Sequence, residues 1–301
     1  MKKLLASVGI LLLSFSLFAV EVNKGELEGR GNDSVQFENY GGPHAVIESA
    51  AAIVGIGTAL GREVAADVEN PLSVQPGAKY SVYHVVGAEE QGLDADILNL
   101  GSNAGVDHIN NLRRIITGYL MAAYDYSAED AETLAVFITV YNAVYRGNLE
   151  NFTSKYKGAV ITYLSEDSVG LSRNWEEWAG RTQIVIPLGE LAEGAASVET
   201  SVISDDKVIE ALRTDEDKGV EVREKLAEMK DKEAVTASEK AKTAQKEAAQ
   251  AKKDGDKVAA KENAKTATEQ QKLADKKSDE VKAEREQIAK EIGRASCRER
   301  V

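Results

Sequence analysis

Two alanine series in the last third of the chain restrict its fold more than any other feature. Each series alternates steps of four and three residues, the heptad spacing of a helical seam (Ala237, Ala241, Ala244, Ala248, Ala251; Ala260, Ala264, Ala267, Gln271, Ala274). The two series are out of phase in one straight helix, but a turn at Asp254–Asp256 brings them face to face. The spacing therefore predicts an antiparallel helical hairpin. Because alanine pairs bury little apolar area, a single long helix and a disordered segment are the alternatives.

The charge of the chain is divided between two regions. Residues 21–220 hold 14 Lys or Arg against 32 Asp or Glu, whereas residues 221–290 hold 18 against 16 and contain neither an aromatic residue nor proline. An acidic body repels phosphates, so nucleic acid is excluded as a partner and anionic lipid as the main one. We expect an acidic globule with an apolar interior, followed by a helical extension that has almost no apolar interior of its own. Weak self-association through this extension is compatible with the sequence.

Both ends of the chain are predicted to lie outside the folded protein. Residues 1–19 begin with Lys2 and Lys3, continue as an apolar run and end at Ala19, which predicts a secretory signal peptide. An uncleaved anchor is the alternative, although the run is shorter than a membrane span needs. Residues 292–301 read as the translation of a sequencing adapter, with a basic tail as the alternative. Cys297, the single cysteine, lies there, so no disulfide framework or cysteine zinc site is expected.

Between these ends we predict an extended segment (20–42), a globular α+β domain (43–215) that is mainly helical, and the helical extension (216–290). No segment after the leader is long and apolar enough to span a membrane. Alternating and β-branched patterns predict three strands of a small sheet: Tyr80–Val86, Asp94–Leu100 and Gln183–Pro187. Apolar stripes at helical spacing and capping residues predict the helices: His44–Val68 opened by Pro43, one with the stripe Leu112–Leu120, one capped by Ser127, Leu149–Leu164, and Asp205–Leu212.

Three glycines interrupt the first predicted helix. Gly55, Gly57 and Gly61 resemble a dinucleotide-binding loop, but no strand precedes them and no acidic residue follows at the required distance. They instead predict a helix face of small residues, or a break that lets two backbones approach closely. We therefore expect no cofactor.

The acidic residues and histidines of the body suggest no clear metal site. His44, His84 and His108 are far apart in sequence and are expected to be isolated. Asp94 and Asp96 lie two apart on a predicted strand and so share a face. They are expected to form an acidic solvent face, with a divalent-cation site completed by Asp107 as the alternative. We predict no catalytic residue and no metal ligand.

Arginines and both tryptophans form the remaining candidate site. In an acidic domain, arginines usually neutralise carboxylates and cap helix C-termini. The functional alternative is a pocket for an anionic or sugar-like ligand. The candidate residues are Arg113, Arg114, Arg146, Arg173, Trp175, Trp178 and Arg181.

Several segments resemble a known family: NLRRIITGYL (111–120), ITVYNAVYRGNL (138–149), GLSR and WAGRTQIVIPL within 170–188, FENYGGP (37–43) and IVGIGTAL (53–60). They are similar, in order and spacing over about residues 20–215, to the Borrelia 83/100-kDa antigen family of spirochaetes. The resemblance implies a signal peptide, an N-terminal domain, a long Lys/Glu-rich helical middle and a C-terminal β-rich domain. The helical extension of this chain is shorter than the helical middle of the Borrelia proteins and richer in alanine. The resemblance carries no catalytic residue or ligand to this sequence.

The sequence thus predicts an exported, non-enzymatic protein of the antigen type, located in the envelope or the periplasm. It consists of a head followed by a helical spacer, and its expected partner is a protein or another component of the cell envelope. An enzyme or small-ligand binder using the Arg/Trp residues, and a surface adhesin on the outer surface, are the alternatives.

Overall fold

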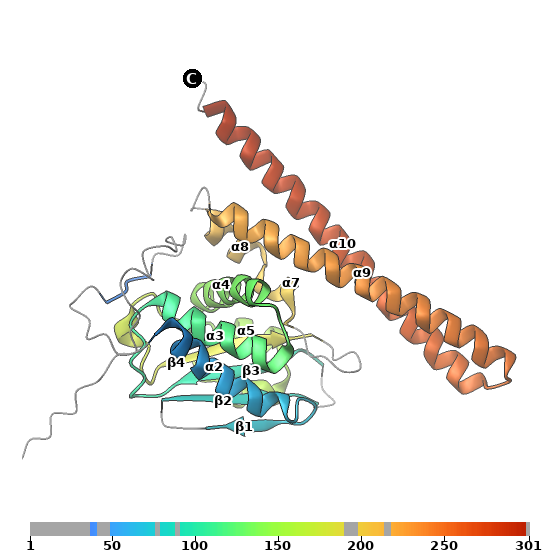
Figure 1. Cartoon of the computed structure of the whole chain (residues 1–301), viewed down its shortest axis with the longest axis horizontal. Coiled ribbons are helices and arrows are strands. Elements are labelled where there is room, and N and C mark those ends of the chain that lie inside the picture. Colours follow the sequence, from blue (N-terminus) through green and yellow to red (C-terminus); the bar gives the residue numbers. More distant parts are fainter. Residues whose placement is uncertain are drawn as a thin grey trace, which may run out of the picture.

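The computed structural model describes residues 37–40, 49–75, 79–87, 91–189, 198–213 and 218–298. We call the described residues up to 213 the head, and the two long helices that follow the arm (Figure 1). The predicted signal peptide and the predicted boundary between residues 215 and 216 lie outside the described residues. Of the predicted extended segment, residues 37–40 are described.

The sheet of the head has four antiparallel strands in the order β1 (Leu72–Val74), β2 (Tyr80–Val85), β3 (Asp94–Leu100) and β4 (Thr182–Leu188). The predictions of the last three are confirmed to within one residue at each end. The short strand β1 was not predicted, because it lies in a stretch between two prolines. One face of the sheet is lined by buried apolar side chains in register, including Val82, Leu98 and Ile184.

The outer edge of β4 is covered rather than open. The Asn142 side chain donates to the carbonyl oxygen of Val185 and accepts from its N–H group, both at 2.9 Å. Further along, Gln183 N–H donates to Ser168 O at 2.8 Å, and Gly170 N–H donates to Gln183 O at 2.9 Å. These bonds satisfy backbone groups that would otherwise pair with another chain.

Helices α2 (Ala50–Ala65) and α3 (Ile109–Tyr124) pack almost backbone to backbone. A Cβ atom on Gly57 would lie 1.8 Å from Ile115 O, and one on Gly118 would lie 2.0 Å from Val54 O. Helix α2 runs through these glycines without a break, so the prediction of a small-residue helix face is confirmed and that of a break is wrong. The predicted start of this helix near residue 44 lies outside the described residues.

Helix α4 (Ala128–Val144) lies against α3 and begins as predicted, with the Ser127 side chain accepting from Asp130 N–H at 3.1 Å. The single helix predicted over Leu149–Leu164 is wrong. The chain forms α5 (Leu149–Lys155) and α6 (Gly158–Ile161), because between them it becomes extended and bridges to Leu93. The remaining short elements of the head are η1 (Trp175–Glu177), α7 (Thr200–Ile203) and α8 (Asp206–Arg213).

The arm consists of α9 (Lys218–Lys253) and α10 (Lys257–Arg298), which lie side by side and antiparallel, so the predicted hairpin is confirmed (Figure 1). Gly255 has φ +84°, a conformation that favours glycine, and the Asp256 side chain caps α10 by accepting from Val258 and Ala259 N–H groups. Most of the predicted seam is shielded from solvent, but Ala264 is exposed and the half-buried Asn263 takes its place.

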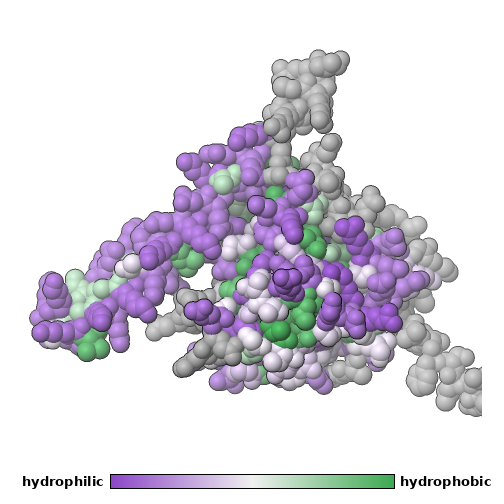
Figure 2. Space-filling view, turned by 180° about the vertical axis from the view of Figure 1, so that it is seen from behind, coloured by the Kyte–Doolittle hydropathy of each residue, from purple (hydrophilic) through white to green (hydrophobic). Residues whose placement is uncertain are grey.

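The first turns of α9 belong to the head as well as to the arm. Leu226 and Met229 are buried in the same apolar cluster as the side chains of the head, and α9 packs against α4 and α8. Beyond this base the arm projects away from the head, and hydrophilic residues cover most of its visible surface (Figure 2). Within the described residues, no helix has the length and apolar character needed to cross a membrane.

Candidate functional site

Residues Phe37–Tyr40, which we call the strap, lie across one end of the head. Glu38 forms a parallel backbone bridge with the segment before η1: its N–H group donates to Arg173 O at 2.8 Å, and its carbonyl accepts from Trp175 N–H at 3.2 Å. Tyr40 N–H donates to Asp107 O at 3.0 Å. The Asn39 side chain accepts from the first N–H group of α3, that of Ile109, at 2.8 Å. Together these contacts join the strap to two distant parts of the chain.

Three of the predicted site residues gather around the rings of the strap. Phe37 meets the edge of Trp178 at a centroid distance of 6.5 Å, and the guanidinium of Arg113 lies 6.0 Å from its ring centre. Tyr40 meets Trp175 at 5.1 Å. The arginine and both tryptophans are therefore brought together, and part of the chain itself occupies the surface they form.

The other four arginines have separate positions. Arg146 donates from one guanidinium to the carbonyl oxygens of Asp167, Ser168 and Gly170, at 2.8, 2.7 and 3.2 Å, and burial lowers its pKa. Its guanidinium therefore binds the backbone of the loop at residues 167–170. Arg114 is buried and donates to Asn111 at 3.1 Å, whereas Arg173 and Arg181 are exposed.

Asp107, beneath the strap, is almost completely buried. Burial raises its pKa to about 6, although hydrogen bonds from its own backbone and from Asn111 act in the opposite direction. Burial and the charge of Asp107 also raise the pKa of Tyr80. No regular spacing in the sequence marks this acid, since it lies in the loop before α3.

A second polar cluster lies inside the head, between the sheet and α3. His84 and Asp96 are direct partners across β2 and β3, with 2.5 Å between Nδ1 and Oδ1. His84 Nε2 lies 2.8 Å from the carbonyl oxygen of Val68. Both ring nitrogens face oxygen atoms that can accept a hydrogen bond, an arrangement that favours the protonated imidazole. Burial alone would lower the pKa of His84, but Asp96 and this carbonyl raise it.

Two tyrosines of α3 complete this cluster. The hydroxyl groups of Tyr119 and Tyr124 both donate to Oδ2 of Asp96, at 2.6 Å for Tyr119. Burial and the charge of Asp96 raise the pKa of each tyrosine well above its usual value. All four side chains are buried and bond to one another, so the cluster holds the sheet to α3 and presents no group to a substrate.

The predicted acidic solvent face of Asp94 and Asp96 is therefore wrong. The register of β2 and β3 places His84 opposite Asp96 and takes both inside, while Asp94 is half-buried and pairs with Lys157 at 2.8 Å. Across the described part of the chain, no group of three His, Cys, Asp or Glu residues is placed to hold a metal ion. One sequence signal could have identified this pair. His84 and Asp96 are titratable residues that share a strand face with apolar residues, on two strands that pair in the structure.

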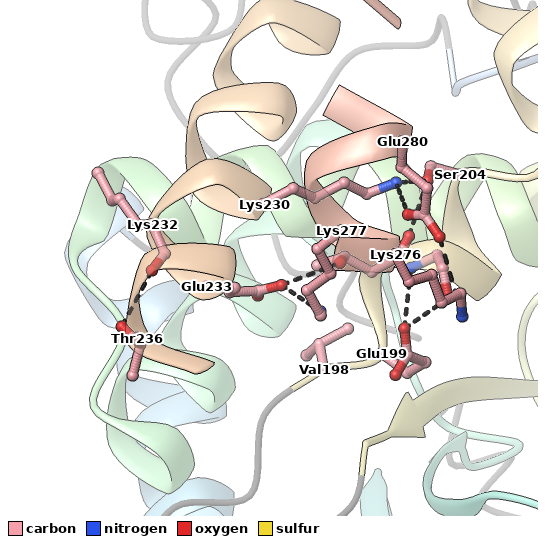
Figure 3. A network of polar contacts seen from close by, with 12 residues as sticks. Val198, Glu199, Ser204, Lys230, Lys232, Glu233, Thr236, Lys276, Lys277 and Glu280 are labelled. Carbon is pink, nitrogen blue, oxygen red and sulfur yellow. Dashed lines mark hydrogen bonds and ion pairs between the residues drawn. The ribbon is translucent and has the colours of Figure 1, made fainter. Parts of the chain in front are cut away.

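A third polar site is the junction of head and arm (Figure 3). Lys230 of α9 donates to Ser204, at the end of α7, at 2.8 Å, and to Glu280 of α10 at 3.0 Å. Glu233 of α9 accepts from Thr200 of α7 at 3.3 Å and pairs with Lys277 of α10. Each of these two α9 residues thus binds the head and the second arm helix at once.

Further contacts strengthen the junction on both sides. Arg223, which is 1% exposed, pairs with Glu284 at 2.5 Å between the two arm helices. Glu199, just before α7, donates its N–H group to Pro187 O of β4 at 2.8 Å. Burial alone would raise the pKa of Glu199, but the charge of Lys277 and bonds from Ser201 outweigh it and lower the pKa. A continuous path of contacts therefore leads from the sheet through α7 to the arm.

These features define a class: a mainly helical α+β head with a four-stranded antiparallel sheet, carrying a long antiparallel helix pair. The chain belongs to the Borrelia P83/100 protein family, whose sequence profile matches residues 24–300, and the resemblance inferred from the sequence is confirmed. Comparisons with curated proteins and with solved structures found no match.

Proposed function

We propose that this chain is a non-enzymatic envelope protein in which the head holds a helical spacer at a set direction. The leader-like residues 1–19 support export to the periplasm or the envelope. The arm would then serve for reach and orientation, since a helix extends ~1.5 Å per residue.

The observation that carries this proposal is the junction at Lys230 and Glu233. A flexible tether needs no buried charges at its base, because each buried ion costs desolvation energy that only good pairing offsets. Here each charge is paired across the arm and also bonds to α7 of the head. Such a base favours one arm direction over others.

The polar groups inside the head support the non-enzymatic part of the proposal. The His84–Asp96 pair and the two tyrosines bonded to Asp96 are buried and engage one another. Arg113 and Trp178 are covered by Phe37 of the strap. A small anionic or sugar-like ligand at the Arg/Trp residues would first have to compete with that ring.

Distances between two spin labels test the spacer. One label is placed at the arm tip (Lys253→Cys) and one on the head (Glu166→Cys), with Cys297→Ser to remove the single cysteine of the chain. We expect a narrow distance distribution that broadens in the Glu233→Gln variant. Glu269→Gln is the matched control, since Glu269 pairs with Lys265 across an exposed turn of α10, at 3.5 Å. A broad distribution in the otherwise unaltered chain would refute the spacer role.

Placement in the cell is tested separately. Protease added to intact cells should leave a periplasmic chain uncut, and permeabilised cells should lose it. Cleavage of the arm on intact cells would instead support the surface adhesin, and retention in the cytoplasm would overturn export.

A further inference from the structure

We propose that the surface on which the strap lies, formed by Arg113, Trp175 and Trp178, is a peptide-binding groove. In this structure the strap itself fills the groove. The ligand it fits is an extended segment of a partner protein with the pattern aromatic, any residue, Asn, aromatic. This proposal does not depend on the role of the arm.

The strap is held by means that transfer to another peptide. Its second residue, Glu38, uses both backbone groups in the bridge, while its side chain is exposed, so this position carries no sequence preference. Adding an extended peptide through such backbone bonds is a common recognition mode, with specificity left to alternate side chains.

The remaining three positions are read by different groups. Phe37 lies against Trp178 and beneath Arg113, which selects an aromatic ring. Tyr40 lies against Trp175, which selects a second ring. The amide oxygen of Asn39 accepts from Ile109 N–H at the start of α3, a helix end that needs an acceptor.

The groove is held in shape by contacts outside the strap. Trp178 donates its indole N–H group to Ser172 O at 2.8 Å, and Arg113 donates to Thr139 at 2.9 Å. The Asn174 side chain accepts from Glu176 N–H at 3.0 Å and caps η1. A site whose residues are fixed in this way loses little conformational freedom when a peptide binds.

The strap competes with any incoming peptide because it is part of the same chain. Tethering gives it an effective concentration that reaches the millimolar range for short linkers. A partner peptide therefore binds weakly while the strap is seated, and the strap sets the threshold for docking.

The test is fluorescence anisotropy with a labelled synthetic peptide of residues 34–43, added to the full chain and to the Phe37→Ala/Asn39→Ala/Tyr40→Ala variant. We expect the variant to keep an unchanged circular dichroism spectrum. It should bind the peptide about tenfold more tightly than the unaltered chain, because its own strap no longer competes for the groove. Replacing both aromatic residues of the peptide with alanine should weaken binding about tenfold or more.

Two further variants separate docking from folding. Trp175→Ala, placed in the strap variant, should abolish peptide binding, while Tyr163→Ala, a matched change at an exposed tyrosine elsewhere on the head, should not. If the triple variant unfolds, Phe37→Ala alone replaces it, with a smaller gain expected. Unfolding of both variants would show that the strap is part of the fold and would overturn the proposal.

Two results from folded variants would also overturn it. The first is absence of peptide binding. The second is a dimer that depends on Phe37 and on chain concentration, which would assign the groove to a second copy of the chain.

Discussion

The head and the arm are both rich in helix, but they pack it in opposite ways. In the head, α2 and α3 meet through glycines, and large side chains such as Trp178, Tyr119 and Phe137 fill the interior. In the arm, the distal seam is mostly alanine, and the base is held by paired charges around Arg223 and Lys230. The difference teaches that the stability of the molecule resides mainly in the head, and that the arm depends on its base.

The largest effect is expected from the polar cluster inside the head. Asp96→Ala leaves a buried imidazolium and two buried hydroxyl groups without their acceptor, which we expect to cost about 3–5 kcal/mol of unfolding free energy. Urea denaturation followed by tryptophan fluorescence measures it. Asp94→Ala on the same strand removes the pair with Lys157, which lies nearer the surface than the cluster, and should cost about 1–2 kcal/mol. Equal losses would contradict the closed cluster.

Helix packing in the head gives the next largest effect. Gly57→Ala should cost about 3 kcal/mol, because the added Cβ would lie 1.8 Å from a carbonyl oxygen of α3 and force the helices apart. Gly55→Ala is the control in the same helix: nothing lies within 4 Å of its added Cβ, so it should stabilise the chain by about 0.5–1 kcal/mol. Thermal unfolding of both variants checks the contrast, and a destabilised Gly55→Ala would count against it.

The buried acid Asp107 should make stability depend on pH. Its pKa is raised from 3.8 to about 6 in the folded chain, so between pH 4 and 6 the folded state keeps a proton that the unfolded chain releases. The unfolding free energy should therefore fall as the pH rises through this window, by about 2–3 kcal/mol in all. Asp107→Asn should remove this fall, measured by urea titrations at pH 4, 5, 6 and 7. An identical slope in the variant would refute the assignment.

The smallest effect is expected at the base of the arm. Glu284→Gln weakens the pair with the buried Arg223, and we expect the proximal part of α10 to loosen by about 1–2 kcal/mol while the head stays folded. Hydrogen exchange of the α10 amides measures the loosening. Glu269→Gln, in an exposed pair of the distal arm, should change exchange by less than about 0.5 kcal/mol. Global unfolding of Glu284→Gln would show that the head cannot stay folded when the pairing of α9 with α10 is weakened.

How far the sequence predicted the fold depended on whether a signal was local. The helix of Leu112–Leu120, the cap at Ser127 and the turn at Gly255 follow from residues close together in the chain, and all were predicted. The break at Tyr156 was missed, because it depends on a bridge to Leu93, far away in sequence. The strand β1 was missed because it lies between Pro71 and Pro76 and has three residues, too few to show an alternation.

The candidate site shows the same division. The Arg/Trp residues were selected from composition and local context, but their meeting around Phe37 follows from a segment far away in the sequence. His84 and Asp96 were noticed separately and not as a pair. The local sequence of a strand specifies neither which strand becomes its neighbour nor in which register they pair. The junction at Lys230 and Glu233 was missed because, in the sequence, these two residues resemble the other charged residues of the arm.

The sequence alone therefore determined the periodic part of this protein: the alanine seam, the turn that folds it back, the amphipathic helices and the acidic body. These depend on spacing within a few turns of chain, where side chains meet whatever the rest of the molecule does. The tertiary structure alone decided which charges are buried, what covers the tryptophans and how the arm is fastened. Those outcomes depend on which distant segments exclude water from one another, and only the packed chain sets that.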